Sequence, residues 1–281
     1  MHPIIVAVDE SPESGTALRL AHLLAARTSR SIVAIEVARP TSAEHSPGDL
    51  ARFEESIARR ARRWLPDDLA PEVAVEVSDG PVSSVLVNRA RALDASFVLL
   101  GAHESEGHTR LGLGSAAHSL AHDLTCPLIV VPDIGSAELT GNVVVGIDGS
   151  DASAVALEAG AALAAQLGGS AVAVYAIDDI YTTFSSHGWY GKEEVAARQE
   201  ALAGPAGVEF VERLGGSTED ILTDLVHERH ASVLVVAARE RHGLGGLLLG
   251  DVPDHLMHRP PCPVMVLPYA FVTTHEPAAH G

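Results

Sequence analysis

The chain has 281 residues, of which 47% are hydrophobic but only 4% aromatic, and its formal net charge is −18. Two domains are expected, because this length exceeds what one small core usually needs, and a phosphate-backbone partner is disfavoured without a basic surface. No apolar run approaches the roughly 20 residues of a membrane span. Met1-His2-Pro3 leads straight into an apolar run, so we expect a cytoplasmic protein with no membrane or nucleic-acid partner.

The first half of the chain alternates short apolar runs with amphipathic segments. Residues 4–8 form an apolar run that ends in a polar loop at residues 9–14, after which apolar residues recur at helical spacing. Four further strands and two further helices are predicted, the strands at residues 31–37, 73–77, 97–100 and 128–131 and the helices at 48–65 and 82–93. Strands that alternate with helices predict right-handed crossovers and a parallel sheet covered on both faces.

The pattern restarts after residue 141. Asp148 follows Asp9 by 139 positions, and Cys262 follows Cys126 by 136. The five predicted strands recur at residues 143–147, 171–176, 208–214, 233–237 and 264–267. A near-constant offset indicates duplication, with a first domain at 1–132, a linker at 133–141, a second domain at 142–268 and a flexible tail at 269–281. The two cysteines occupy matching positions, so we expect them to be buried separately.

The stretch from residue 98 to 132 combines several features that suit an anion. Gly101 ends an apolar run, a polar loop follows, and Gly114 and Ser115 open an amphipathic segment. The Ser115 hydroxyl can cap this helix, and Gly114 lets the backbone approach a ligand closely. Free N–H groups at the helix start attract anions, so the geometry suits a phosphate.

This stretch resembles the nucleotide loop of the universal stress protein family, which reads Gly, two residues, Gly, nine residues, Gly and then Ser or Thr. Gly101, Gly114 and Ser115 match the first, third and fourth motif positions, whereas Glu104 replaces the second glycine. The resemblance extends over both repeats. It implies two tandem Rossmann-like units, similar to adenine nucleotide alpha hydrolases, each a five-stranded parallel sheet with helices on both faces. It also implies that the units pack through their fifth strands as an intramolecular pseudo-dimer.

By this resemblance, the first repeat carries a site that binds ATP with or without magnesium. In an open α/β sheet, ligands collect beyond the carboxyl ends of the strands where strand order reverses. The turn after the first strand is then expected to contact the ribose and adenine, and the glycine loop to hold the phosphates. The candidate binding residues are Asp9, Glu10, Ser11, Gly101, Gly114 and Ser115.

Two of these residues have structural alternatives. Asp9 also suits a loop turn or a helix cap, and Ser115 also suits an N-cap that forms with or without ligand. Glu104 is expected to weaken the site, because a carboxylate about 6 Å from a phosphate costs roughly 2 to 3 kcal/mol at an effective dielectric of about 20. A metal ion between the two groups would remove this cost.

The second repeat departs further from the motif. Ala237 and Glu240 occupy the two leading glycine positions, and Asp251 stands where Ser or Thr belongs. A carboxylate at the helix N-terminus competes with phosphate, so we interpret this site as degenerate. Asp148 is then a structural turn residue.

Other chemistries are less well supported by the residues. Gly-x-Gly-x-x-Gly does not follow the first strand of either repeat, and Gly-x-Ser-x-Gly does not occur. His118 and His122, and likewise His255 and His258, have helical spacing, but neither pair has a convincing third metal ligand. His122 and His258 each precede a cysteine by four residues, which favours packing or capping at a helix end.

The resemblance therefore implies a stress-responsive regulator that is linked to a nucleotide and has an unidentified protein partner. No set of catalytic residues is found in the sequence. Slow ATP hydrolysis is therefore the most enzymatic activity that we expect. The alternative is a protein-interaction scaffold of the same fold that binds no nucleotide. Homodimerisation of the whole chain is left open.

Overall fold

All ten apolar runs that were predicted as strands are strands in the structure, a computed structural model. It describes residues 2–9, 11–38, 52, 55, 59, 73–102, 113–135, 139–177, 207–238, 241–243, 246–248 and 250–275. The first repeat runs β1 (Ile4–Ala7), α1 (Pro12–Thr28), β2 (Ile32–Ala38), β3 (Val73–Asp79), α3 (Val82–Leu93), β4 (Phe97–Gly101), α4 (Leu113–Asp123) and β5 (Leu128–Val131). Most of the helix predicted at residues 48–65 lies outside the described residues, although residues 52, 55 and 59 are helical.

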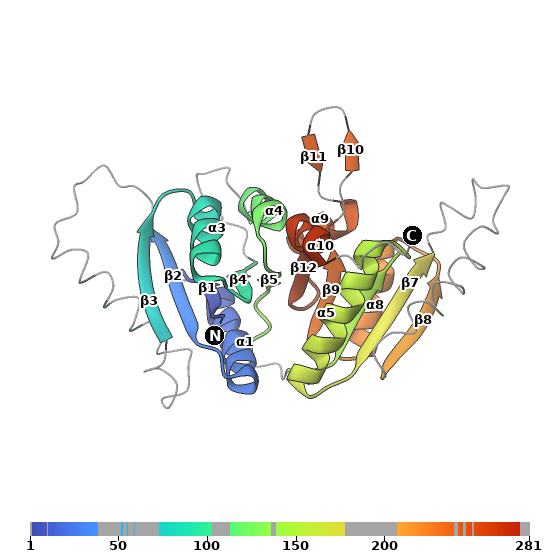
Figure 1. Cartoon of the computed structure of the whole chain (residues 1–281). Helices are drawn as coiled ribbons and strands as arrows, with labels where there is room; N and C mark the ends of the chain where they lie inside the picture. The colour runs from blue at the N-terminus through green and yellow to red at the C-terminus, as the bar shows by residue number, and fades with distance from the viewer. Residues whose placement is uncertain are drawn as a thin grey trace.

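The second repeat has the same order of elements, with two additions. It runs β6 (Val143–Ile147), α5 (Asp151–Leu167), β7 (Ala171–Ile177), β8 (Val208–Leu214), α8 (Thr218–Glu228), β9 (Val233–Ala237), β10 (Arg241–Gly243), β11 (Gly246–Leu248), α9 (Asp251–His258), β12 (Val264–Leu267) and α10 (Tyr269–His275). The first addition is the β10–β11 hairpin, which projects from the body of the molecule (Figure 1). The second is α10.

The two repeats share one ten-stranded sheet in the order β3-β2-β1-β4-β5-β12-β9-β6-β7-β8. Strands are parallel within each repeat, and the fifth strands β5 and β12 pair in antiparallel fashion at the centre (Figure 1). This confirms the predicted fold class and the packing of the two units through their fifth strands.

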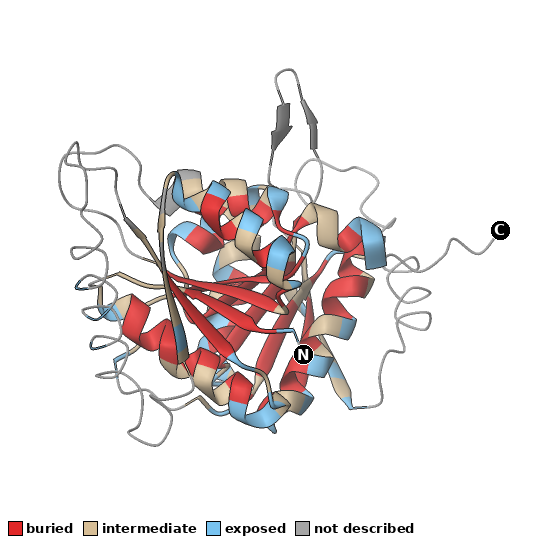
Figure 2. Ribbon diagram, turned by 60° about the vertical axis from the view of Figure 1, so that its left-hand side comes forward, coloured by how far each residue is buried: buried red, intermediate tan, exposed pale blue. Residues whose placement is uncertain are grey.

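Helices cover both faces of the sheet and bury its central strands, whereas the outer strand β8 stays partly exposed. One core layer lies under α1 and α5, and the other lies under α3, α4, α8 and α9. The central strands are buried along most of their length (Figure 2), as near-continuous runs of valine, isoleucine and leucine require in a parallel sheet. The helices of the two repeats also meet, since α1 contacts α5 and α4 contacts α9.

The first part of the tail expected at residues 269–281 is helical, and residues 276–281 lie outside the described residues. Residues 269–275 form α10, which contacts α4 of the first repeat and α5 of the second. Val272 is buried against the core layer that contains α5, and Phe271 packs beside it. The segment is therefore held by contacts with both repeats rather than by its own helix propensity.

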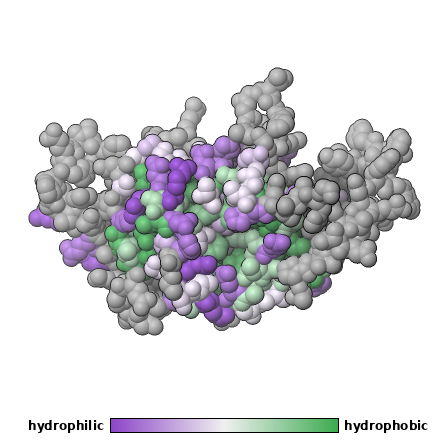
Figure 3. Space-filling model, in the orientation of Figure 1, coloured by the Kyte–Doolittle hydropathy of each residue, from purple (hydrophilic) through white to green (hydrophobic). Residues whose placement is uncertain are grey.

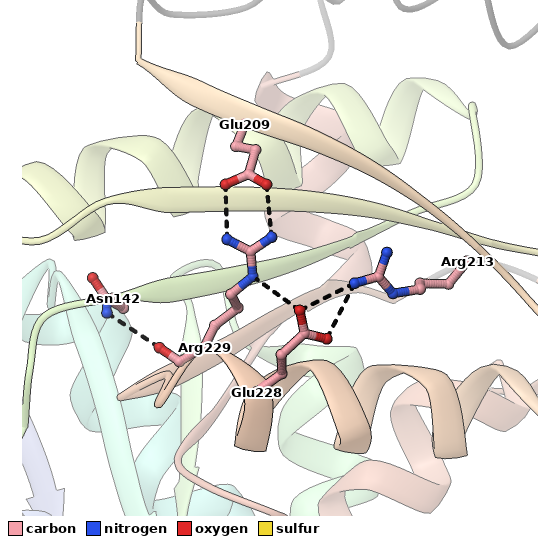
Figure 4. A network of polar contacts seen from close by, with 5 residues as sticks. All are labelled: Asn142, Glu209, Arg213, Glu228 and Arg229. Carbon is pink, nitrogen blue, oxygen red and sulfur yellow. Dashed lines mark hydrogen bonds and ion pairs between the residues drawn. The ribbon is translucent and has the colours of Figure 1, made fainter.

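Each outer strand of the sheet is tied to a helix by a bidentate arginine–glutamate pair. In the first repeat, Arg89 of α3 donates from Nε to Glu76 Oε2 of β3 at 2.7 Å and from a second nitrogen to Oε1. In the second, the Arg229 guanidinium donates to both Glu209 oxygens at 2.9 and 2.6 Å (Figure 4). These hydrogen bonds raise the pKa of Arg229. Because the geometry is bidentate, each pair also orients its strand against the helix.

The surface of the protein is mixed in polarity. On the face shown in Figure 3, hydrophobic residues reach the surface in several separate areas that are divided by hydrophilic ones. Among the large hydrophobic side chains of the described residues, Val82 and Leu214 are exposed. None of the helices in the described ranges is both long and apolar enough to cross a membrane.

Candidate functional site

The topology brings the carboxyl ends of β1 and β4 together. β1 lies between β2 and β4, and the chain leaves β1 through α1 on one face but reaches β4 and β5 through α3 and α4 on the other. Strand order therefore reverses between β1 and β4, which is where an open α/β sheet leaves a crevice for a ligand. Asp9 follows β1 and Gly101 ends β4, so two of the predicted site residues lie at this point.

The turn after β1 is built around one carboxylate oxygen. Asp9 Oδ1 accepts hydrogen bonds from the Ser11 amide at 2.9 Å, the Ser11 hydroxyl at 2.5 Å and the Ser14 hydroxyl at 2.6 Å. Ser14 Oγ in turn accepts from the Asp9 amide at 3.0 Å, and Ser11 Oγ accepts from the Ser14 amide at 3.2 Å. Ser11 is the N-cap of α1, with Pro12 as the first helical residue. The turn thus fixes Asp9 and starts α1 at the same time.

The second repeat contains the same network. Asp148 Oδ1 accepts from the Ser150 amide at 3.0 Å, the Ser150 hydroxyl at 2.6 Å and the Ser153 hydroxyl at 2.5 Å. Ser153 Oγ accepts from the Asp148 amide at 2.9 Å, and Ser150 is the N-cap of α5. The structure therefore gives the turn role expected for Asp148, and it gives Asp9 the same role.

Ser14 and Ser153 are the members of these networks that the sequence analysis did not single out. Each is only 3% exposed, which is unusual for serine, and each bonds directly to the aspartate of its repeat. The signal was present in the sequence, because both repeats read Asp-x-Ser-x-x-Ser at this point.

Gly101 lies against the first turn of α1. A Cβ built on Gly101 would be 2.7 Å from Glu13 Cβ and 3.1 Å from the Ser14 amide nitrogen. A side chain here would displace the helix start that carries the Asp9 network. Gly101, Asp9 and Ser11 are thus brought together around this turn, and the glycine has a packing reason as well as the phosphate role that the family resemblance implies.

The helix that follows the glycine loop begins earlier than expected. α4 starts at Leu113, so Ser115 lies inside the first turn and is not the N-cap that its hydroxyl suggested. Gly114 and Ser115 are instead the second and third helical residues, whose N–H groups have no intrahelical acceptor in any α-helix. Glu10 and Glu104 lie outside the described residues.

The corresponding region of the second repeat has a different structure. The β10–β11 hairpin occupies the place of the glycine loop, and α9 follows with Gly250 as its N-cap. Asp251 is the first helical residue, so its carboxylate lies at the helix N-terminus as expected and adds a favourable charge to the first turn. The prediction that this site is degenerate is untested and remains a prediction.

The two cysteines are packed in the core, and His258 lies at the end of a helix. Cys126 and Cys262 are free and buried, as predicted, and burial raises the pKa of each thiol to about 12, with Asp94 adding to the effect at Cys126. His258 Nδ1 lies 2.7 Å from the Asp254 carbonyl oxygen one turn back, in the last turn of α9. Over the described part of the chain, no three histidine, cysteine or acidic side chains come together to hold a metal ion.

The comparisons with known proteins agree with this architecture. The model of the universal stress protein family matches residues 1–132 and 140–268. A universal stress protein of Mycolicibacterium smegmatis is 27% identical over 293 residues, which cover 94% of this chain and 96% of the relative. The crystal structure of a universal stress protein from Archaeoglobus fulgidus has a TM-score of 0.68 at 17% identity and covers 95% of this chain and 98% of its own.

The two family matches include both repeats, so the chain belongs to the universal stress protein family. It is a tandem member, with two family domains joined in one α/β sheet. Among the solved structures is a universal stress protein in complex with cAMP, which is 20% identical, covers 46% of this chain and 96% of its own, and has a TM-score of 0.38.

Proposed function

We propose that the first repeat binds ATP and that the protein acts as a stress-responsive regulator through this site. The observation that supports the proposal most directly is the placement of Asp9, Ser11 and Gly101 around one helix start at the strand-order reversal. The resemblance to the nucleotide loop of the universal stress protein family, to which the chain belongs, makes ATP the expected ligand at this end of the sheet.

The residues suit the parts of a nucleotide in different ways. The Asp9 carboxylate is held by its network before any ligand arrives, so binding does not have to order it. An ionised carboxylate accepts hydrogen bonds from ribose hydroxyls but repels phosphate, so Asp9 belongs to the nucleoside end of the ligand. The phosphates then lie near the first turn of α4, which contains Gly114 and Ser115 and whose amides have no acceptor within the helix.

Isothermal titration calorimetry with ATP, with and without magnesium, tests this proposal. Asp9→Asn keeps an acceptor oxygen in the turn but removes its charge, and we expect it to weaken ATP binding roughly 10- to 100-fold, the effect of losing a charge-assisted hydrogen bond. Asp148→Asn makes the same change in the matching turn of the second repeat and is the control. It is expected to leave ATP binding unchanged.

Three outcomes are decisive. Equal weakening by both variants would place binding elsewhere or make it a consequence of stability. Absence of heat from the wild-type protein would refute ATP binding and favour a nucleotide-free interaction scaffold. The matching turns of the two repeats also suit a scaffold, since each one caps a helix. Phosphate release above background in the same samples would add hydrolysis to the function.

A further inference from the structure

The join between the two repeats is symmetric in its backbone. Residues 128–130 of β5 pair with residues 266–264 of β12, and Ile129 pairs with Met265 at the centre. Cys126 and Cys262 stand 136 positions apart, and the same offset makes Ile129 and Met265 equivalent. A residue that pairs with its own counterpart marks a pseudo-twofold axis. All six side chains of the ladder are apolar, so this pairing alone would join two copies of either repeat equally well.

The helices above this ladder make a contact of a different kind. α4 packs against α9, and His118 Nδ1 lies 3.5 Å from Asp254 Oδ1. These residues are also 136 positions apart, so they are counterparts that meet near the same axis. Two copies of the first repeat joined in this way would place one histidine against another. Two copies of the second repeat would place one aspartate against another.

We propose that His118 and Asp254 determine which repeats pair. When His118 is protonated, opposite charges favour joining the first repeat to the second, and the like charges of a self-pairing oppose the two alternatives. A symmetric homodimer cannot make this distinction, because it places the same residue on both sides of its axis. Duplication within one chain removes that constraint, and the two positions have become complementary.

The surroundings of the pair set the size of the effect. The His118 and Asp254 side chains are 36% and 43% exposed, so solvent screens their attraction. His258 Nδ1 lies 3.7 Å from the same Asp254 oxygen, and His122 is paired with Asp123 at 2.7 Å. Other titratable residues on these two helices and on the elements packed against them are Arg89, Arg91, Glu219, Asp220, Asp224, His227, Glu228, Asp251, His255, Tyr269 and His275.

A double-mutant cycle in the full chain tests the proposal. The variants are His118→Asp, Asp254→His and the combined swap, which restores opposite charges in reversed positions. Urea unfolding is measured at about pH 6, below the ordinary histidine pKa of about 6.5. We expect each single variant to unfold more readily, and the swap to have an unfolding constant roughly two- to fivefold smaller than the product of the single effects predicts. This coupling should largely disappear in about 1 M salt, where charges are screened.

A matched control uses His255, the neighbour of Asp254 on the exposed side of α9. The cycle of His118→Asp with His255→Asp exchanges the same two residue types on the same two helices, but His255 makes no pair with His118, and the effects of this cycle are expected to add. Additive effects in the His118 and Asp254 cycle as well, or a coupling that high salt does not change, would overturn the proposal.

Discussion

The turn networks predict a stability loss that is the same in both repeats. Ser14→Ala removes one hydrogen bond to the Asp9 carboxylate, at 2.6 Å, and the acceptor of the Asp9 amide, at 3.0 Å. A hydrogen bond to a charged group contributes roughly 1.5 to 3 kcal/mol, and a neutral one roughly 0.5 to 1.5 kcal/mol. Because Ser14 is buried, water cannot readily replace either bond. We therefore expect Ser14→Ala to lower the free energy of unfolding by about 2 to 4 kcal/mol.

Ser153→Ala is the matched experiment in the second repeat, where the two bonds are 2.5 and 2.9 Å long. Urea unfolding followed by circular dichroism, without nucleotide, measures both variants. The two losses are expected to agree within about 1 kcal/mol, because the geometry is the same. A loss below about 0.5 kcal/mol in either variant would refute the structural role of the network. So would a loss confined to the first repeat.

Three further predictions concern other parts of the chain. Gly101→Ala should cost about 1 to 3 kcal/mol without nucleotide, because its Cβ would lie 2.7 Å from Glu13 Cβ, and a lower melting temperature would show this. Burial raises the pKa of Cys126 and Cys262 to about 12, so the folded protein keeps protons that the unfolded chain loses above pH 9 or so. The free energy of unfolding should therefore fall by up to about 1.4 kcal/mol per pH unit for each thiol above that pH, and urea unfolding of the double alanine variant should show a flatter dependence. Glu104→Gly restores the family glycine and should tighten ATP binding tens to a hundred-fold, as measured by calorimetry. Unchanged affinity would refute the expected repulsion between the Glu104 carboxylate and the phosphates.

The sheet could be predicted almost completely from the sequence. Short apolar runs at a near-constant offset revealed both the strands and the duplication, since buried parallel strands leave a strong compositional signal. α10 could not be predicted in this way. Its sequence Tyr-Ala-Phe-Val-Thr-Thr-His is rich in β-branched and aromatic residues, which have weak helix propensity, so packing of Val272 against the core decides its structure.

The candidate site was predictable only in part. Asp9, Ser11 and Gly101 lie where strand order was expected to reverse, but Ser14 was not predicted as a partner of Asp9, although both repeats share the pattern Asp-x-Ser-x-x-Ser. The helix start was placed too late, because Gly112 and Gly114 both suit a loop and only backbone hydrogen bonding places the start at Leu113. In the second repeat, the antiparallel pairing of β10 with β11 was not predicted, because each strand has only three residues and leaves little pattern in the sequence.

The antiparallel ladder between β5 and β12 also bears on the behaviour of the protein at low abundance. Two separate subunits that met through this ladder would dissociate once their concentration fell below their dissociation constant. Here the two strands belong to one polypeptide, and a short tether holds such partners at an effective concentration of the order of millimolar. The paired arrangement therefore persists when a cell contains only a few copies, and its halves are always made in equal amounts.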